Sequence, residues 1–175
     1  MANTNKPFGL APVRSLAGSW AQQATRYYIY SSDGSAYYIG DAVFSAAQGD
    51  DTGTCGIAKA TGALRLRGVI VGFEPVNQLN ISLQGTALDL SITSVPASKT
   101  QAYYAYVVDD PHVVFSIQGD GTATNQVATN SNKNFSLTIT AGATTVSASG
   151  TVMSSSTLNT TDTLNMKAMG LLQVP

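Results

Sequence analysis

The sequence LRLRGVIVGF at residues 64–73 gives the strongest indication of the fold class. Its apolar residues alternate with a period of two, which is typical of a β-strand with one face against a core. Leu66 and Ile70 fall in one phase of this alternation, whereas Val71 falls in the other. The change of phase near Gly68 indicates a bulge or bend within the strand.

The rest of the chain repeats such alternation in short pieces separated by turns. Two tyrosine-rich runs, RYYIY at 26–30 and AYYI at 36–39, flank SSDGS at 31–35, whose Asp-Gly pair is a strong turn signal. Further strands are predicted at residues 42–45, 80–83, 88–93, 101–108, 113–118, 135–140, 144–149 and 164–173. About ten short strands with regular turns are typical of a sandwich or barrel. We therefore predict an all-β chain folded as a jelly-roll-like β-sandwich or barrel.

The N-terminal residues differ from the rest of the chain. They form an apolar stretch that is stiffened by proline and lacks strand alternation, and its members are Pro7, Phe8, Leu10, Pro12 and Val13. We predict an extended N-terminal arm over residues 1–20 and a single β-sandwich domain over residues 21–175. The arm cannot bury its side chains against itself, so it lies either on its own domain or on a neighbouring subunit.

The composition describes a surface solvated by neutral polar groups. Charged residues make up 11% of the 175 residues, and the formal net charge is −1; soluble domains average about 25% charged residues. Copies of such a chain repel one another weakly, and neutral polar faces pack against partners without a large cost of charge desolvation. The balance argues against direct nucleic-acid binding, which needs many Lys and Arg contacts to phosphate. A polar secreted domain is the alternative.

The sequence shows no sign of export or of membrane insertion. No apolar run is long enough to span a bilayer, and the N-terminus lacks the pattern of a signal peptide. The single cysteine, Cys55, excludes an intrachain disulfide. We expect a protein that is made in a cytoplasm and has no membrane partner.

Residues that support catalysis are scarce. The single histidine, His112, follows a proline at the entrance of a predicted strand and has no Gly-x-Ser-x-Gly motif to accompany it. Glu74 is the only glutamate, and the adjacent Asp109 and Asp110 would point to opposite faces of a strand. The acidic pair at residues 50–51 lacks the spacing of an EF-hand. We predict no enzyme activity, no catalytic residues, no metal site and no cofactor.

The eight tyrosines leave two kinds of binding open. Tyrosines on strands stack on sugars in lectins, and they also anchor protein interfaces. All eight lie in the two tyrosine-rich runs and in QAYYAY at 101–106. A glycan-binding β-sandwich module therefore remains an alternative to a structural protein.

Four segments, in this order, resemble a family of capsid cement (decoration) proteins of tailed bacteriophages. The first is PFGLAPVR at 7–14, and the second runs from RYYI at 26–29 to IGDAV at 39–43. The third and fourth are GVIVGFEP at 68–75 and VDDPHVVF at 108–115. The resemblance covers about the first two thirds of the chain and fades over the Ser- and Thr-rich C-terminal third. His112 departs from the family, in which that position is often acidic.

The resemblance implies a virion structural protein that binds the outer surface of the capsid and cements contacts between major capsid protein subunits. It implies no catalytic residues. The N-terminal arm is then the candidate strap over a neighbour, with Phe8 and Leu10 as anchors and Arg14 as an ion-pair partner. The candidate capsid or subunit interface consists of Pro7, Phe8, Leu10, Pro12, Val13, Arg14 and Trp20. Rim contacts are expected at Tyr27, Tyr37, Asp109 and Asp110.

The partners expected from this reading are the major capsid protein and further copies of the chain itself. A homodimer at two-fold positions and a homotrimer at three-fold positions both fit. A tail or head-fibre component is a second structural alternative, and the expected location is the outer surface of the capsid.

Overall fold

The computed structural model describes residues 6–19, 23–61, 65–74, 92–121, 128–142 and 147–172. This part of the chain is built from short strands and two 3₁₀ turns, η1 (Ala128–Asn130) and η2 (Ser155–Thr157). The strands are β1 (Ala11–Ser15), β2 (Thr25–Ile29), β3 (Tyr37–Tyr38), β4 (Ala42–Gly49), β5 (Cys55–Lys59), β6 (Gly68–Glu74), β7 (Ser94–Val95), β8 (Tyr103–Val108), β9 (Val113–Ser116), β10 (Asn134–Phe135), β11 (Leu137–Thr138), β12 (Val152–Met153) and β13 (Met166–Lys167). The predicted all-β class is confirmed.

Five of the strands close into a barrel in the order β2-β5-β4-β6-β8. All neighbours in the barrel are antiparallel except β2 and β5, which meet in parallel at Tyr28 and Gly56. The sequence LRLRGVIVGF forms β6 from Gly68 onward, and the predicted irregularity lies slightly later, between Ile70 and Gly72. The strand predicted at residues 80–83 and most of the one at 88–93 lie outside the described residues.

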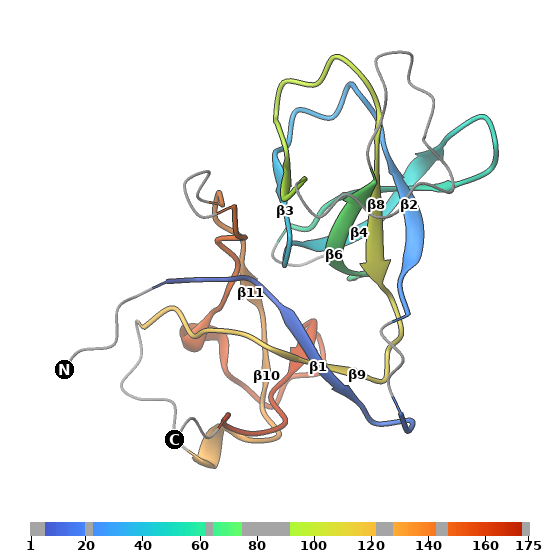
Figure 1. The fold of residues 1–175 in the computed structure, drawn as a ribbon. Coiled ribbons are helices and arrows are strands. Elements are labelled where there is room, and N and C mark those ends of the chain that lie inside the picture. Colours follow the sequence, from blue (N-terminus) through green and yellow to red (C-terminus); the bar gives the residue numbers. More distant parts are fainter. Residues whose placement is uncertain are drawn as a thin grey trace.

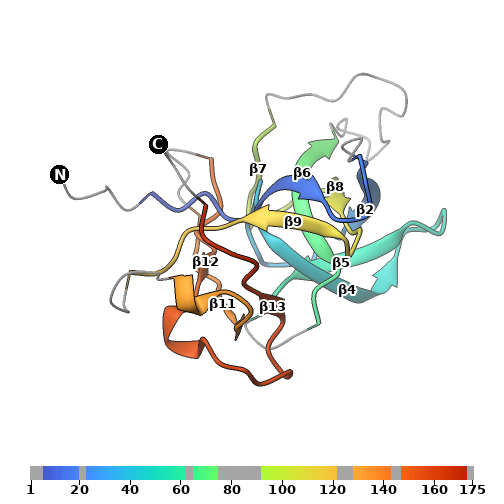
Figure 2. The ribbon, with the colours of Figure 1, turned by 90° about the horizontal axis from the view of Figure 1, so that it is seen from below.

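A second group of strands lies beside the barrel. It contains three two-stranded sheets, β1-β9, β10-β13 and β11-β12, whereas β3 and β7 pair next to the barrel itself. Figure 1 shows the barrel strands at the upper right and the labelled strands β1, β9, β10 and β11 at the lower left. In the view from below, β9 is drawn in front of the barrel, and β11, β12 and β13 are drawn toward the lower left (Figure 2).

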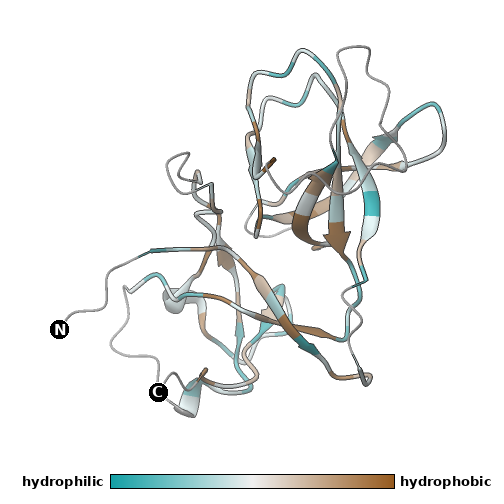
Figure 3. Ribbon diagram, in the orientation of Figure 1, coloured by the Kyte–Doolittle hydropathy of each residue, from teal (hydrophilic) through white to brown (hydrophobic). Residues whose placement is uncertain are grey.

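Two apolar clusters form the core of these two groups. The first fills the barrel and includes the fully buried Ile29, Ile57 and Phe73. The second joins residues of the barrel wall, such as Val69, to Phe135 of the second group. The hydropathy colouring shows apolar residues along β6, β8 and β9 (Figure 3). Because the second cluster contains residues of both groups, the two groups pack as one body.

The N-terminal segment is held against the barrel by a close backbone contact. Leu10 is 2% exposed in the second cluster, and its backbone N–H donates to the carbonyl of Gly40 over 2.9 Å. Gly9 and Gly40 both have left-handed backbones, with φ of 75° and 90°. A Cβ on Gly9 would lie 2.4 Å from the Gly40 oxygen, so the approach requires glycine. Within this chain the segment therefore packs on its own domain, which is one of the two arrangements that the sequence left open.

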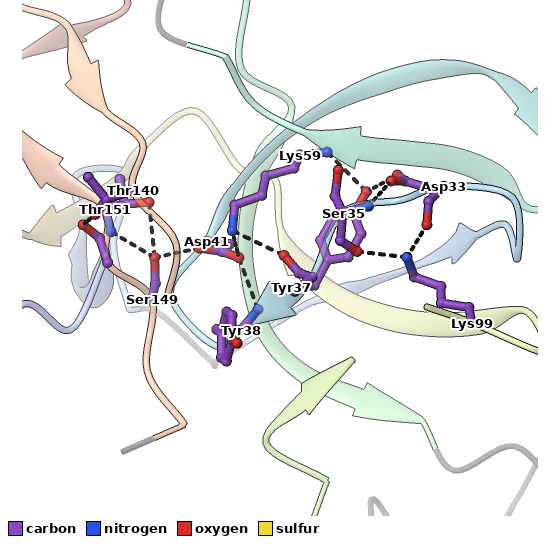
Figure 4. Close-up of polar contacts among 12 residues, drawn as sticks. Asp33, Ser35, Tyr37, Tyr38, Asp41, Lys59, Lys99, Thr140, Ser149 and Thr151 are labelled. Carbon is purple, nitrogen blue, oxygen red and sulfur yellow. Dashed lines mark hydrogen bonds and ion pairs between the residues drawn. The ribbon is translucent and has the colours of Figure 1, made fainter. Parts of the chain in front are cut away.

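A buried carboxylate fixes the same junction from the other side (Figure 4). Asp41 has no exposed surface, and its side chain forms an ion pair of 2.8 Å with Lys59 of β5. It also accepts hydrogen bonds from the Tyr38 backbone N–H and from the hydroxyl of Ser149. Ser149 belongs to the C-terminal third, so this one carboxylate ties that third to the barrel.

We predict that Asp41→Ala lowers the free energy of unfolding by about 3–5 kcal/mol, because it leaves the Lys59 ammonium buried without a counter-charge. Urea unfolding at neutral pH measures the change. Asp162→Ala, which removes an exposed carboxylate, is the matched control and is expected to change stability by less than about 0.5 kcal/mol. An equal effect of the two substitutions would show that the Asp41 carboxylate does not stabilise the fold through its ion pair with Lys59.

Candidate functional site

The described residues line a cleft of about 1890 Å³. One wall comes from the N-terminal segment and its partner strand β9, and another comes from the chain around Met169. The barrel contributes the start of β6 and the two arginines that precede it, Arg65 and Arg67. The cleft thus lies where the N-terminal segment, the barrel and the C-terminal residues meet.

Exposed apolar side chains gather at this cleft. Six large hydrophobic residues are exposed in the described part of the chain, and every one of them lines the cleft: Phe8, Val13, Leu16, Met169, Leu171 and Leu172. Leu172 is 71% exposed and Leu16 is 54% exposed. Scattered single apolar residues are ordinary on protein surfaces, whereas six exposed ones on the lining of one cleft favour a binding surface.

The interface residues predicted in the N-terminal segment differ in their exposure. Phe8, Val13 and Arg14 line the cleft with exposed side chains. Pro7 and Pro12 are half-buried. Leu10 is buried in the second apolar cluster, so its predicted role as an anchor for a partner is corrected to a core residue. The predicted contact at Trp20 lies outside the described residues.

Two of the predicted rim tyrosines are corrected as well. Tyr27 is 3% exposed and Tyr37 has no exposed surface, because both rings belong to the barrel core. Each hydroxyl reaches a carboxylate at the barrel edge: Tyr27 donates to Asp109 over 2.7 Å, and Tyr37 donates to Asp33. Aromatic side chains of this kind bury their rings while the polar end keeps a partner.

The two predicted acidic contacts do line the cleft. Asp109 forms an ion pair of 3.1 Å with Arg67 and accepts a hydrogen bond from Tyr27. Burial and then the hydrogen bond to Asp109 raise the pKa of Tyr27. Asp110 is exposed and accepts from the His112 backbone N–H over 2.8 Å, and this hydrogen bond lowers the pKa of Asp110. The Asp109 carboxylate is therefore already paired with Arg67 and Tyr27 of the same chain.

A second polar cluster joins residues of β2, β6 and β8 to the hairpin between β4 and β5. Arg26 donates to Glu74 over 2.6 Å, and its guanidinium lies 3.6 Å from the centre of the Tyr104 ring. The Tyr104 hydroxyl donates to Asp50 over 2.7 Å. Asp50 also accepts from the backbone N–H groups of Thr52 and Thr54 at the tip of the β4–β5 hairpin. The described polar atoms of this cluster bond one another, which is the arrangement of a structural brace.

Neither the polar residues around Asp109 nor those around Asp50 form a set of metal ligands. Within the described ranges, no three His, Cys, Asp or Glu side chains are close enough to hold an ion. No helix in the described part of the chain is long and apolar enough to cross a membrane. The chemistry that the cleft itself offers is apolar contact together with charge, from side chains at its walls.

No protein-family model matches the sequence, and neither a curated protein nor a solved structure matches it. The function is therefore inferred from the residues and from the geometry of the cleft.

The sequence does not predict three of the six exposed apolar residues of the cleft as surface residues. Met169, Leu171 and Leu172 fall within the strand predicted at residues 164–173, whereas the observed strand covers only Met166–Lys167. Gly170 interrupts this apolar run and is the one signal that would have separated it from a strand.

The second polar cluster predicts a pH dependence of stability. Desolvation opposes ionisation of Asp50, but the hydrogen bonds from Tyr104, Thr54 and Thr52 outweigh it and hold the pKa of Asp50 below its usual range. The native state then binds fewer protons than the unfolded state, so this stabilisation is present above about pH 4 and is lost as the pH falls further.

We expect Asp50→Asn to be less stable than the wild-type chain at pH 7, and the difference to shrink as the pH falls toward about 3. Urea unfolding midpoints between neutral and acid pH measure it, with Asp162→Asn as the control. A constant difference at all pH values would contradict the assignment.

Proposed function

We propose that this chain is a capsid cement protein of a tailed bacteriophage, which binds the outer surface of the capsid and stabilises contacts between major capsid protein subunits. One observation carries the proposal: all the exposed large apolar side chains of the described residues lie on a single cleft. The resemblance of four ordered segments to the cement family adds to it. The cleft is then the face that seats on the shell.

The way the four segments meet supports this proposal. The first supplies Gly9 and Leu10, which contact Gly40 of the second. The Gly40 N–H donates to the carbonyl of Ile70 in the third segment over 2.8 Å. Val69 pairs with Val108, where the fourth segment begins. The resembling segments thus form one continuous unit, and this unit also supplies several walls of the cleft.

A cement protein works by mass action. It binds the assembled shell and not the separate subunits, so it stabilises the assembled state by the free energy of its binding. Many copies that act on one shell add avidity beyond any single contact. An apolar cleft rimmed by polar groups has the anatomy of such an interface. No bond is made or broken in this function, so it requires neither a cofactor nor catalytic residues.

The finer expectations belong to the same proposal. They are a jelly-roll-like arrangement of the strands, a homodimer or homotrimer on the shell, and a location on the outer surface of a virion assembled in a host cytoplasm. A tail or head-fibre component is the structural alternative. The glycan-binding alternative has less support, because Tyr27 and Tyr37 are buried rather than displayed.

Cryo-electron microscopy of the intact virion tests the proposal directly. The expected result is density for this chain in symmetric copies that bridge capsid subunits, with the cleft toward the shell. Absence from the shell but presence elsewhere on the virion would favour the tail or fibre alternative, and absence from the virion would exclude a structural role.

The cleft itself is tested by Leu16→Ala combined with Leu172→Ala. Both side chains are largely exposed, so the double variant is expected to unfold within about 1 kcal/mol of the wild-type chain. Its occupancy on the capsid is expected to fall, because apolar contact area with the shell is lost. Thr100→Ala with Thr160→Ala, at exposed positions away from the cleft, is the matched control. Unchanged occupancy of the leucine variant would place the interface elsewhere.

A further inference from the structure

The cationic side chains of this chain are unevenly partnered. All nine Lys and Arg residues lie in the described part of the sequence. Arg26, Lys59 and Arg67 form ion pairs, while Lys99 and Lys133 donate hydrogen bonds to oxygen atoms. The remaining four have no such partner among the described residues, and all four line the cleft: Lys6, Arg14, Arg65 and Lys167.

The formal charge of the molecule is divided accordingly. The described residues include all nine cations and nine of the ten carboxylates, since Asp89 lies outside them. Five of these cations and two of these carboxylates line the cleft, so the formal charge of its described lining is 5 − 2 = +3. The other described residues carry four cations and seven carboxylates, or 4 − 7 = −3. A nearly neutral chain therefore concentrates its positive charge where its apolar side chains are exposed.

Such a surface restricts what can cover it. A cation that is removed from water by a partner needs a counter-charge, because burial without one is strongly unfavourable. Neither carboxylate of the cleft is paired with the four free cations, because Arg67 and Tyr27 hold Asp109, and Asp110 contacts the backbone N–H and the ring of His112. The partner must therefore bring negative charge together with apolar contact area.

Two other occupants fit this surface poorly. A second copy that met the cleft face to face would place one formal charge of +3 against another. A nucleic acid would bring the negative charge, but single strands are bound by stacking on aromatic rings. Among the exposed large apolar residues of the described part, only Phe8 is aromatic. A protein segment with carboxylates beside apolar side chains satisfies both features of the cleft.

We propose that the occupant of the cleft is an acidic, apolar segment of the major capsid protein, whose Asp or Glu side chains pair with Arg14 and Arg65. This inference rests on the proposed cement function and adds the chemistry of the partner surface. It makes binding to the shell sensitive to salt, because partly exposed ion pairs weaken as ionic strength rises.

The test uses empty shells assembled from the major capsid protein of the same phage without this chain. Binding of the full chain is measured by co-sedimentation over a range of protein concentrations and of salt. The variant Arg14→Gln with Arg65→Gln removes two cations from the cleft. The control Ser32→Glu with Gln48→Glu changes the net charge by the same two units at exposed positions outside the cleft.

We expect the arginine variant to bind about tenfold more weakly at low salt, since two partly exposed ion pairs together contribute roughly one factor of ten. The control variant is expected to bind like the wild-type chain. The difference between the arginine variant and wild type is expected to vanish near about 1 M salt, where the screening length falls to about 3 Å.

The outcomes separate this inference from the proposed function. Wild-type binding that the arginine variant fully retains would overturn the acidic partner and leave the cement function standing. Equally weakened binding of the control variant would attribute the effect to net charge and would also overturn the acidic partner. Wild-type chain that does not bind the shells would remove the proposed function and this inference with it.

Two further measurements address the rejected occupants. Sedimentation equilibrium that showed self-association of the wild-type chain, lost on Leu16→Ala with Leu172→Ala, would assign the cleft to a second copy. Binding of a labelled single-stranded DNA that Arg14→Gln with Arg65→Gln abolishes would assign it to nucleic acid. Either result would overturn the proposal.

Discussion

The buried carboxylate of Asp41 is the interaction on which the rest of the structure depends. A charge without solvent contact is tolerable only when it is paired and hydrogen-bonded, and here its partners come from three parts of the chain. Lys59 fixes it to the barrel, Tyr38 fixes the turn before β4, and Ser149 brings in the C-terminal third. The two groups of strands share an apolar cluster, but apolar contact is not directional. The hydrogen bonds and the ion pair of the carboxylate are directional, so they fix the position of one group of strands relative to the other.

The cleft inherits its shape from that junction. Gly9 and Gly40 touch beside Asp41, which sets where the N-terminal segment leaves the barrel and therefore where Phe8 and Val13 point. On the other wall, the residues after β13 are carried by a group that Ser149 ties to the same carboxylate. A surface built from short strands and connecting segments would otherwise be poorly organised for binding, because every immobilised side chain costs entropy on association. Here the contacts around Asp41 hold these segments in place before a partner binds.

The sequence predicts where the strands of this fold lie better than it predicts which strands pair with one another. The alternation at residues 64–73 and the tyrosine-rich run at 26–30 correspond to β6 and β2. One-sided burial explains the alternation only in β2, because β6 buries Ile70 in the barrel core and Val69 in the second cluster. β2 does not pair with the next strand along the chain, however; it pairs with β5 and β8, a choice made by the closure of the barrel. Phe8 and Leu10 are both apolar in the sequence, and only the folded chain distinguishes the buried Leu10 from the exposed Phe8. The C-terminal half of the cleft depends on the end of β13, which alternation alone does not locate.

The exposed apolar side chains of the cleft come from opposite ends of the described sequence, and this has a consequence for biosynthesis. A ribosome exposes Phe8, Val13 and Leu16 early, whereas Met169 to Leu172 follow only after nearly all of the other described residues have been translated. A nascent chain that ends before Met169 therefore carries three of these six side chains. The complete set forms only late in translation, so a partner that contacts all six side chains would discriminate against incomplete chains.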